Sequence, residues 1–384
     1  MNVRNINLSL AMVIVGLALM TLGTWPAIAH VSAAEPQTLA LGASAPDFNL
    51  PGVDGRETSL SDFKSAKLLV VVFTCNHCPT AQAYEQRIID LQREYAPRDV
   101  AVVAISPNDP TAVRLDELGY SDLNDSFEDM QLRAKERGFE FPYLYDGDTQ
   151  KTSREYGVLA TPHVFIFDDE RLLRYVGRID DNDVKQPTSH DARNAIEEML
   201  ADKPVSVPQT RVFGCSTKWS DKRQQAADSL AKWNAETAEL TVISPSDLQQ
   251  QLTNPADKYR LVNVWATWCS PCVGEMDDLV TIHRMYRGRE FELITISADD
   301  PTLKGKALKV LKDKHCSARN FIVTIKNQDE LFDAVDLEWQ GAVPYTILIS
   351  PEGKVVHRVH GEFDPLELKR VIVDHLGRTY APRK

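Results

Sequence analysis

Two segments of this chain pass from an apolar run into a pair of cysteines separated by two residues. The first, at 70–79, reads VVVFTCNHCP, and the second, at 262–272, reads VNVWATWCSPC. Apolar runs rich in β-branched residues predict strands buried on both faces, and apolar residues at helical spacing follow each cysteine pair. Each half of the chain is therefore expected to place a Cys-x-x-Cys motif between a buried strand and a helix.

The elements expected around the two motifs come in the same order, which predicts an α/β protein with two domains in tandem. A chain of 384 residues is long enough for each domain to have its own core. In the N-terminal half we expect, in order, strand 67–73, helix 80–96, strand 99–106, helix 129–138, and strands 141–146, 163–168 and 171–179. In the C-terminal half we expect strand 259–265, helix 272–288, strand 291–297, helix 306–315, and strands 320–325, 345–350 and 354–361.

Two polar segments interrupt this order. Residues 108–130 are expected to run over the surface. Residues 203–240 are expected to connect the domains, with a Pro-rich, extended first part and a polar, helix-prone second part. We therefore place the first domain at 41–202 and the second at 241–384.

The net charge of −12 argues against a nucleic-acid partner, because non-specific binding to nucleic acid requires basic patches. The N-terminus has the pattern of a targeting segment, because Arg4 precedes the uncharged apolar run 8–23. The segments 27–29 and 31–34 each end in small residues, which suit cleavage by signal peptidase. We expect residues 1–34 to be a cleaved signal peptide, with an uncleaved membrane anchor as the alternative. Export to the periplasm or cell envelope would place the mature chain where disulfides persist.

A Cys-x-x-Cys motif at the start of a helix can act as a thiol–disulfide switch. The helix dipole and the free N–H groups stabilise a thiolate there and can lower its pKa from about 8.5 to about 3.5–7.5. On this basis we predict that Cys75 and Cys269 are exposed attacking thiols, and that Cys78 and Cys272 are partly buried resolving thiols. A zinc site is disfavoured because neither cysteine pair has further ligands nearby. A purely structural disulfide is disfavoured because it would close a very short loop, which removes little chain entropy from the unfolded state. We therefore expect no metal or other cofactor.

A proline precedes an apolar strand at matching points of the two halves, in TPH and in VPY. With the Cys-x-x-Cys motifs, these prolines resemble the loop that faces the active-site cysteines in the thioredoxin superfamily. The resemblance implies that Pro162 and Pro344 follow cis peptide bonds, although cis is the minority state of an X–Pro bond. It also implies that Thr161 and Val343 present their backbone to an extended substrate.

The C-terminal half is similar to the TlpA/ResA-like disulfide reductases of bacterial envelopes, in VNVWATWCSPCVGEMDDL and GAVPYTILISPEGKVVHRVHG. The resemblance implies that Trp268 flanks the attacking thiol and that Glu275 modulates the proton affinity of the thiols. A solvated glutamate is the alternative for Glu275. Thioredoxin has a buried aspartate six residues before its first active-site cysteine, where this chain has Asn263. Glu275 is therefore the candidate proton carrier.

The N-terminal half resembles the redoxin branch, which is related to the peroxiredoxins, in APDFNLPGVDG, VVFTCNHCPTAQAYE, FPYLYD, TPHVFIFD and GCSTKW. Peroxiredoxins have a Pro-x-x-x-Thr-x-x-Cys motif. Here Val71 takes the place of the proline and Cys75 that of the threonine, which favours disulfide exchange over peroxide reduction. Leu69 stands where thioredoxin has the buried aspartate.

His77 lies directly before the second cysteine, as in the CPHC motif of the oxidising DsbA-like proteins. A protonated donor there stabilises the thiolate and makes the disulfide a stronger oxidant. Electrons would then pass from the Cys269–Cys272 pair to the Cys75–Cys78 pair, unless His77 is an exposed loop residue without influence. In a second alternative Cys75, His77 and Cys78 hold Cu(I), because soft thiolates suit that ion.

Two cysteines fall outside the motifs. Cys215 either folds back as a third thiol of the CNHC site, pairs with a partner, or is a small buried residue. Cys316 follows an expected helix and is predicted to be structural. A Cys215–Cys316 disulfide is a further alternative.

These features predict an exported thiol–disulfide oxidoreductase of the disulfide reductase or isomerase type, with two redox sites that act through mixed disulfides. Protein thiols or disulfides would be the substrates, and a membrane-bound electron carrier would re-reduce the protein. The alternatives are a thiol peroxidase with antioxidant activity and a copper-handling protein.

Overall fold

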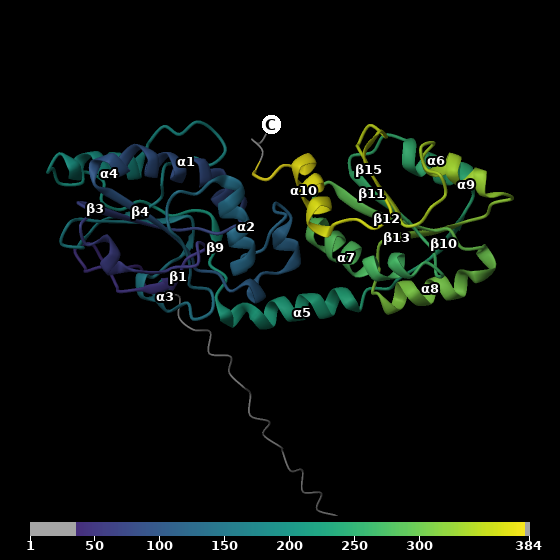
Figure 1. Cartoon of the computed structure of the whole chain (residues 1–384), viewed down its shortest axis with the longest axis horizontal. Coiled ribbons are helices and arrows are strands. Elements are labelled where there is room, and N and C mark those ends of the chain that lie inside the picture. The colour runs from purple at the N-terminus through teal and green to yellow at the C-terminus, as the bar shows by residue number, and fades with distance from the viewer. Residues whose placement is uncertain (1–35, 381–384) are drawn as a thin grey trace, which may run out of the picture. The chain divides into compact units, whose positions relative to one another are not determined.

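The computed structural model describes residues 36–380. The predicted signal peptide, 1–34, lies outside the described residues. The compact unit Glu35–Lys384 contains two open sheets flanked by helices, one in each half of the chain (Figure 1). Among the residues described, no helix has the length and apolar character that crossing a membrane requires.

The five-stranded sheet of the N-terminal half has the order β5-β4-β3-β7-β8. Its central strand, β3 (Leu68–Phe73), is parallel to β4 (Val100–Ser106) and antiparallel to β7 (His163–Phe167). Successive side chains of β3 enter two different apolar clusters on the two faces of the sheet, which is why its whole length is apolar. The other elements of this half are β1 (Asn49–Pro51), β2 (Glu57–Ser59), α1 (Pro79–Tyr95), α2 (Phe127–Arg137), β5 (Tyr143–Tyr145), α3 (Lys151–Tyr156), β6 (Ala160–Thr161), β8 (Leu173–Gly177) and α4 (Asp191–Leu200).

The six-stranded sheet of the C-terminal half has the order β10-β13-β12-β11-β14-β15. Its central strand, β11 (Tyr259–Trp265), is parallel to β12 (Phe291–Ser297) and antiparallel to β14 (Tyr345–Ile349). The other elements are α5 (Arg223–Asn234), β10 (Thr241–Ile243), α6 (Pro245–Thr253), α7 (Ser270–Tyr286), α8 (Lys304–Asp313), β13 (Arg319–Val323), α9 (Gln328–Val335), β15 (Val355–His360) and α10 (Pro365–Leu376). The two halves thus repeat one thioredoxin-like arrangement, and the predicted tandem α/β fold is confirmed.

The polar segment 108–130 does not run over the surface as predicted. Its Asn108 and Asp125 are completely buried and hydrogen-bonded to each other, Nδ2 to Oδ2, at 2.7 Å. Polar side chains can be buried at little cost when their hydrogen bonds are satisfied, which local polarity alone does not reveal. The segment therefore forms part of the interior of the N-terminal half.

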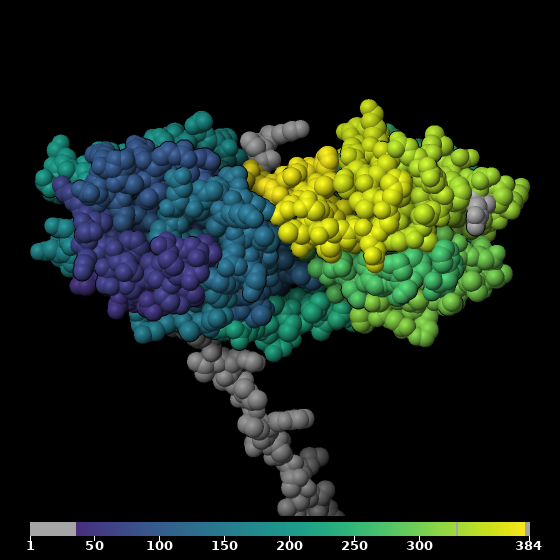
Figure 2. Space-filling view, in the orientation of Figure 1, coloured from purple at the N-terminus to yellow at the C-terminus, as the bar shows by residue number. Residues whose placement is uncertain are grey.

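The same segment also contacts the C-terminal half. Arg370 and Arg378 both form ion pairs with the buried carboxylate of Asp122, and the Tyr286 hydroxyl donates to the Ser121 carbonyl at 3.0 Å. In Figure 2 the yellow surface of the C-terminal residues abuts the blue surface of this region. The ion pairs and the hydrogen bond join the two halves through buried polar groups.

Part of the predicted connector packs on the N-terminal half. The short strand β9 (Cys215–Ser216) pairs antiparallel with β6, so that Cys215 lies opposite Thr161. Buried Trp219 follows this strand in the chain. Gly214 precedes it with φ +139°, and a Cβ at Gly214 would lie 2.0 Å from the Thr161 carbonyl oxygen. Only glycine permits this close approach of two backbones.

Replacing Gly214 by alanine should therefore separate β9 from β6. We expect Gly214→Ala to speed alkylation of Cys75 and Cys78 in the folded protein by about tenfold or more, because local opening exposes buried groups. Gly55→Ala is the matched control: Gly55 also has a positive φ, +82°, but a Cβ there meets no atom within 4 Å. The measurement is the alkylation rate of each cysteine by mass spectrometry. Equal rates in the two variants would contradict the role assigned to Gly214.

Candidate active site: two pairs of cysteines

The helix after each Cys-x-x-Cys motif begins at a different cysteine in the two halves. Cys78 is the N-cap of α1, with Pro79 as the first helical residue, whereas Cys269 is the N-cap of α7, with Pro271 at the second helical position. Proline is accommodated in the first turn because the N–H groups there need no partner within the helix. The prediction of a thiol at the helix start is therefore confirmed for Cys269. For Cys75 it is wrong, because Cys78 occupies that position.

The sulfur of Cys78 is the centre of the N-terminal site. It accepts hydrogen bonds from the backbone N–H groups of Ala81 and Cys215, each at 3.4 Å. Burial opposes its ionisation, but hydrogen bonds from the Cys215 and Cys75 thiols and the charge of His77 outweigh burial. The pKa of Cys78 therefore lies well below its ordinary value.

Cys75 has the opposite character. Burial, the hydrogen bond with Cys78 and the charge of Asp125 raise the pKa of Cys75 well above its ordinary value. Its Sγ lies 3.1 Å from the Thr161 hydroxyl. Only 2% of Cys75 is exposed, so the predicted exposed attacking thiol is a buried one. The overlying strand β9, far away in the sequence, is the reason the sequence pattern missed this burial.

His77 is buried and forms an ion pair with Asp125, with Nδ1 2.6 Å from Oδ2. Burial lowers the pKa of His77, but the charge of Asp125 and its hydrogen bond raise that pKa to a net value above the ordinary one. The imidazolium is thus favoured beside Cys78. The alternative of an exposed histidine is excluded.

Asp125 is the functional residue that the sequence analysis missed. Its carboxylate also accepts hydrogen bonds from the backbone N–H groups of Asn76 and His77, at 2.8 and 3.1 Å. A signal for its place did exist: Ser126 caps α2 through the N–H of Asp129, which marks Asp125 as the residue just before a helix. Nothing local links it to His77, which lies 48 residues earlier in the chain.

The copper alternative named Cys75, His77 and Cys78 as ligands. Within the described part of the chain, the group with metal-ligand spacing is instead Cys75, His77 and Asp125, whose ligand atoms lie within 4.8 Å of one another. A carboxylate replaces the second thiolate in this group, which suits Cu(I) less well. His77 and Asp125 moreover already bind each other.

Both proline loops lie against the cysteines. The peptide bonds Thr161–Pro162 and Val343–Pro344 are cis, as the resemblance implies. The Cys78 thiol donates to the Thr161 carbonyl at 3.4 Å, and Cys269 Sγ lies 3.7 Å from the Val343 carbonyl. The residue before each proline thus contacts a sulfur. Pairing with β9 occupies the backbone edge of Thr161, whereas none of the described strands pairs with Val343.

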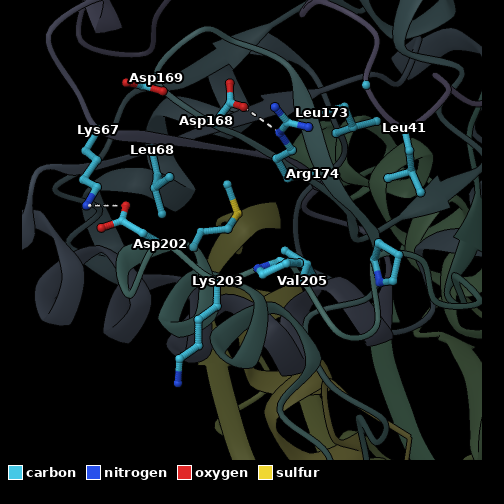
Figure 3. A pocket seen from close by; sticks show the side chains of 14 residues that line it. Leu41, Lys67, Leu68, Asp168, Asp169, Leu173, Arg174, Asp202, Lys203 and Val205 are labelled. Atoms are coloured by element: carbon cyan, nitrogen blue, oxygen red, sulfur yellow. Dashed lines mark hydrogen bonds and ion pairs between the residues drawn. The ribbon is translucent and has the colours of Figure 1, made fainter.

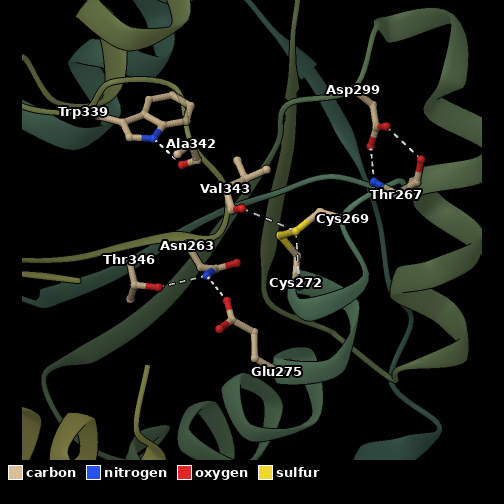
Figure 4. Close-up of a disulfide and its surroundings, with 10 residues drawn as sticks. All are labelled: Asn263, Thr267, Cys269, Cys272, Glu275, Asp299, Trp339, Ala342, Val343 and Thr346. Carbon is tan, nitrogen blue, oxygen red and sulfur yellow. Dashed lines mark hydrogen bonds between the residues drawn. A yellow bond between two sulfur atoms is a disulfide. The ribbon is translucent and has the colours of Figure 1, made fainter. Parts of the chain in front are cut away.

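The C-terminal pair forms a disulfide between Cys269 and Cys272 (Figure 4). Near it, Asn263 donates through Nδ2 to Glu275 Oε1 at 2.9 Å and to the Thr346 hydroxyl at 3.0 Å. Glu275 is 7% exposed, and its Oε2 has no hydrogen-bond partner. Burial outweighs the hydrogen bond from Asn263 and raises the pKa of Glu275 to about 7. The alternative of a solvated glutamate is therefore wrong, whereas the role of Glu275 stays a prediction.

Two further contacts shape the loops of this site (Figure 4). Asp299 accepts hydrogen bonds from the N–H and the hydroxyl of Thr267, two residues before Cys269. Trp339 donates through its indole N–H to the Ala342 carbonyl at 2.7 Å, next to the cis-proline loop. Cys269 itself is only 5% exposed, against the prediction of an exposed thiol, whereas Trp268 beside it is 67% exposed.

Cys316 lies apart from both pairs. It is completely buried and its thiol donates to Asn320 Oδ1 at 3.4 Å, which fits the predicted structural role. Cys215 and Cys316 are both free, so the alternative of a disulfide between them is not realised.

A cavity of about 710 Å³ opens on the N-terminal half (Figure 3). Two ion pairs cross its wall, between Lys67 and Asp202 and between Arg174 and Asp168. No cysteine is among the residues that line it.

A family model described as the AhpC/TSA family matches residues 41–176 and again residues 223–358. The chain belongs to the AhpC/TSA family. Both copies of the family domain include a Cys-x-x-Cys motif and a cis-proline loop, so the repeat inferred from the sequence is a repeat of this domain.

Curated relatives and a solved structure also resemble this AhpC/TSA family member. The thiol-disulfide oxidoreductase ResA of Geobacillus thermodenitrificans is 28% identical over 128 residues, which are 33% of this chain and 69% of that protein. ResA of Bacillus subtilis is 27% identical over 29% of this chain and 58% of that protein. A hypothetical protein from Sinorhizobium meliloti 1021 is 34% identical, with a TM-score of 0.43, over 48% of this chain and 97% of that chain.

The ion pair of His77 with Asp125 predicts the behaviour of the Cys78 thiolate. In Asp125→Asn the imidazolium loses its counter-ion, so the pKa of Cys78 should rise and its thiolate should appear at higher pH. The measurement is ultraviolet absorbance of the thiolate against pH, in full-length protein that also carries Cys269→Ser and Cys272→Ser. Asp168→Asn, which removes a carboxylate paired with Arg174, is the control. An unchanged titration in Asp125→Asn would rule out this coupling.

The raised pKa of Glu275 predicts a pH-dependent stability. The folded state holds the Glu275 proton more tightly than the unfolded state does. Protonation of Glu275 therefore contributes fully to stability below about pH 4.5, and this stabilisation is lost as the pH rises through about 7. Wild-type protein should therefore lose stability relative to Glu275→Gln over this interval. Urea unfolding of both proteins at a series of pH values measures the difference, and a difference independent of pH would contradict the assignment.

Proposed function

We propose that this protein is an exported thiol–disulfide oxidoreductase with two redox pairs, Cys75–Cys78 and Cys269–Cys272. The observation that carries the proposal is that both halves place a cysteine sulfur at a helix N-terminus and against a cis-proline loop. Helix N-termini stabilise thiolates, which are the reactive form in disulfide exchange. The names of the ResA relatives support the same chemistry.

In the C-terminal site Cys269 is the attacking thiol once the pair is reduced. Its position as N-cap stabilises its thiolate, which attacks a substrate disulfide to form a mixed disulfide. Cys272 then attacks the Cys269 sulfur and releases the reduced substrate. Glu275 accepts the Cys272 proton, because a carboxyl with a pKa near 7 can gain and lose a proton at neutral pH.

The backbone of Val343 and the exposed indole of Trp268 give this site its substrate surface. An extended protein segment can pair with the backbone of Val343, with which no described strand pairs, as in other cases of strand addition. Protein thiols or disulfides are therefore the proposed substrates. A membrane-bound electron donor and export to the periplasm complete the proposal, on the pattern of residues 1–34.

The two pairs differ in redox poise. The N-terminal pair has an imidazolium and several hydrogen-bond donors around Cys78, which stabilise its reduced form. A stabilised reduced form makes the corresponding disulfide the stronger oxidant. Electrons would therefore move from Cys269–Cys272 to Cys75–Cys78.

The proposal predicts two reversible two-electron transitions. Two full-length variants isolate them: Cys75→Ser with Cys78→Ser, and Cys269→Ser with Cys272→Ser. Each is equilibrated at a series of glutathione ratios and its free thiols are labelled. The surviving N-terminal pair should be reduced at a higher potential than the surviving C-terminal pair, and every 30 mV between them corresponds to about 1.4 kcal/mol.

The outcomes separate the proposed functions. A pair without a reversible disulfide would refute the redox role of its half. Rapid turnover of hydrogen peroxide by the N-terminal half would favour the peroxidase alternative, and stoichiometric Cu(I) binding would favour the copper alternative. The reverse order of potentials would overturn the proposed direction of electron flow.

A further inference from the structure

The N-terminal site has no exposed thiol in its Cys-x-x-Cys motif. Cys75 is 2% exposed and Cys78 is completely buried. Cys215 is half-buried and lies between the exposed residues Gly214 and Ser216. An external thiol therefore meets Cys215 before it meets either cysteine of the motif.

The position of Cys215 is fixed by pairing on one side and by buried anchors on the other. β9 pairs with β6 opposite Thr161. After it, Lys218 is buried, donates its N–H to Asn108 Oδ1 at 2.8 Å and forms an ion pair with Glu117 at 2.7 Å. Trp219 is buried in the core of this half, with the Arg154 guanidinium 4.5 Å from the centre of its ring. These contacts hold Cys215 against the cysteine pair.

Cys78 lies next to both of the other cysteines of the site. Cys215 packs against Cys75, Cys78 and Ala81, and its N–H donates to Cys78 Sγ at 3.4 Å. The thiols of Cys75 and Cys215 both lower the pKa of Cys78, beside which they pack. Cys75, in turn, contacts the Thr161 hydroxyl. Two disulfides are thus within reach of one sulfur, Cys75–Cys78 and Cys78–Cys215.

We propose that Cys215 is the third redox thiol of the N-terminal site, that it exchanges with the Cys75–Cys78 disulfide to form a Cys78–Cys215 disulfide, and that external thiols react at its sulfur. The inference rests on the redox function proposed for this site. It adds the residue through which the buried pair communicates with its surroundings.

The exchange is balanced within the protein. The Cys215 thiol loses its proton and bonds to Cys78, the Cys75–Cys78 bond breaks, and Cys75 takes up a proton. An external thiol then bonds to Cys215 and the Cys78–Cys215 bond breaks, with Cys78 leaving as the thiolate. A second external thiol attacks the mixed disulfide, releases the external disulfide and restores the Cys215 thiol. Two external thiols have then given two electrons and one proton to the protein, and their second proton passes to solvent because Cys78 remains a thiolate.

Cys78 is a good leaving group in the second exchange. A thiol of low pKa leaves faster in disulfide exchange, and Cys78 is the sulfur whose thiolate its neighbours stabilise. Cys75, with its raised pKa, retains a proton once it is released. After these steps the negative charge therefore lies on the sulfur of Cys78, which accepts hydrogen bonds from the backbone.

The first test maps the disulfides. Full-length protein carrying Cys269→Ser and Cys272→Ser is oxidised with glutathione disulfide, quenched in acid, alkylated and digested for mass spectrometry. We expect the Cys78–Cys215 linkage in this parent, that linkage alone after adding Cys75→Ser, and Cys75–Cys78 alone after adding Cys215→Ser. Buried Cys316 should stay free throughout and controls for non-specific oxidation.

The mapping can overturn the proposal in two ways. In the first, the Cys215→Ser variant forms its Cys75–Cys78 disulfide, but under the same conditions Cys78 and Cys215 stay free in the Cys75→Ser variant. The second way depends on the parent. If the Cys75→Ser variant fails to fold, the parent decides: absence of the Cys78–Cys215 linkage from the oxidised parent overturns the proposal, and its presence supports it.

The second test measures reduction of the oxidised parent by glutathione. Cys215→Ser should slow reduction by about tenfold or more, because the attack must then reach buried sulfurs. Ser216→Ala, at the exposed neighbouring position of β9, should reduce at the parental rate. Reduction of Cys215→Ser at the parental rate overturns the proposal that external thiols react at Cys215.

The two proposals fail differently. If Cys215→Ser forms its Cys75–Cys78 disulfide reversibly and is reduced at the parental rate, the redox function stands and the role of Cys215 is refuted. If no pair among the three thiols of the parent forms a reversible disulfide, the redox function of the N-terminal half is refuted itself.

Discussion

The position of one proline relative to two cysteines governs the chemistry of each site. A proline fits the first turn of a helix and disrupts later turns, so it limits where the helix can begin. In CSPC the proline lies between the cysteines and α7 starts at Cys269. In CNHCP the proline follows the second cysteine and α1 starts at Cys78. The same motif, in the same fold, therefore presents a different sulfur to the helix N-terminus in each half.

The rest of the N-terminal site follows from this shift. A thiolate at Cys78 is completely buried, and a buried charge needs partners. Segments distant in sequence supply them: Asp125 holds the His77 imidazolium, and β9 brings the N–H and thiol of Cys215 to the sulfur. These segments also cover the site. Stabilisation of the thiolate and closure of the site are thus two effects of the same contacts.

The C-terminal site is arranged differently. Among the described strands, none pairs with Val343 of its cis-proline loop, and an exposed tryptophan lies beside its first cysteine. The acidic group that thioredoxin has on the central strand lies instead on α7, where Glu275 contacts the Asn263 amide that replaces it. One half therefore has an exposed tryptophan and a buried carboxyl group near its cysteines, and the other has a paired loop edge and an imidazolium.

The sequence by itself determined the two motifs, their buried strands and the repeat of one α/β fold, because periodicity is local. The cis bonds before Pro162 and Pro344 followed only from the resemblance to the thioredoxin superfamily. It missed the helices α3, α4, α6, α9 and α10, although the side chains of Ser244, Asn327 and Asp364 cap three of them. Only the tertiary structure decided that Asp125 and Cys215 meet the CNHC motif, since 48 residues separate Asp125 from His77 and 137 separate Cys215 from Cys78. Contacts over such distances are chosen by how the whole domain packs, and no local pattern records them.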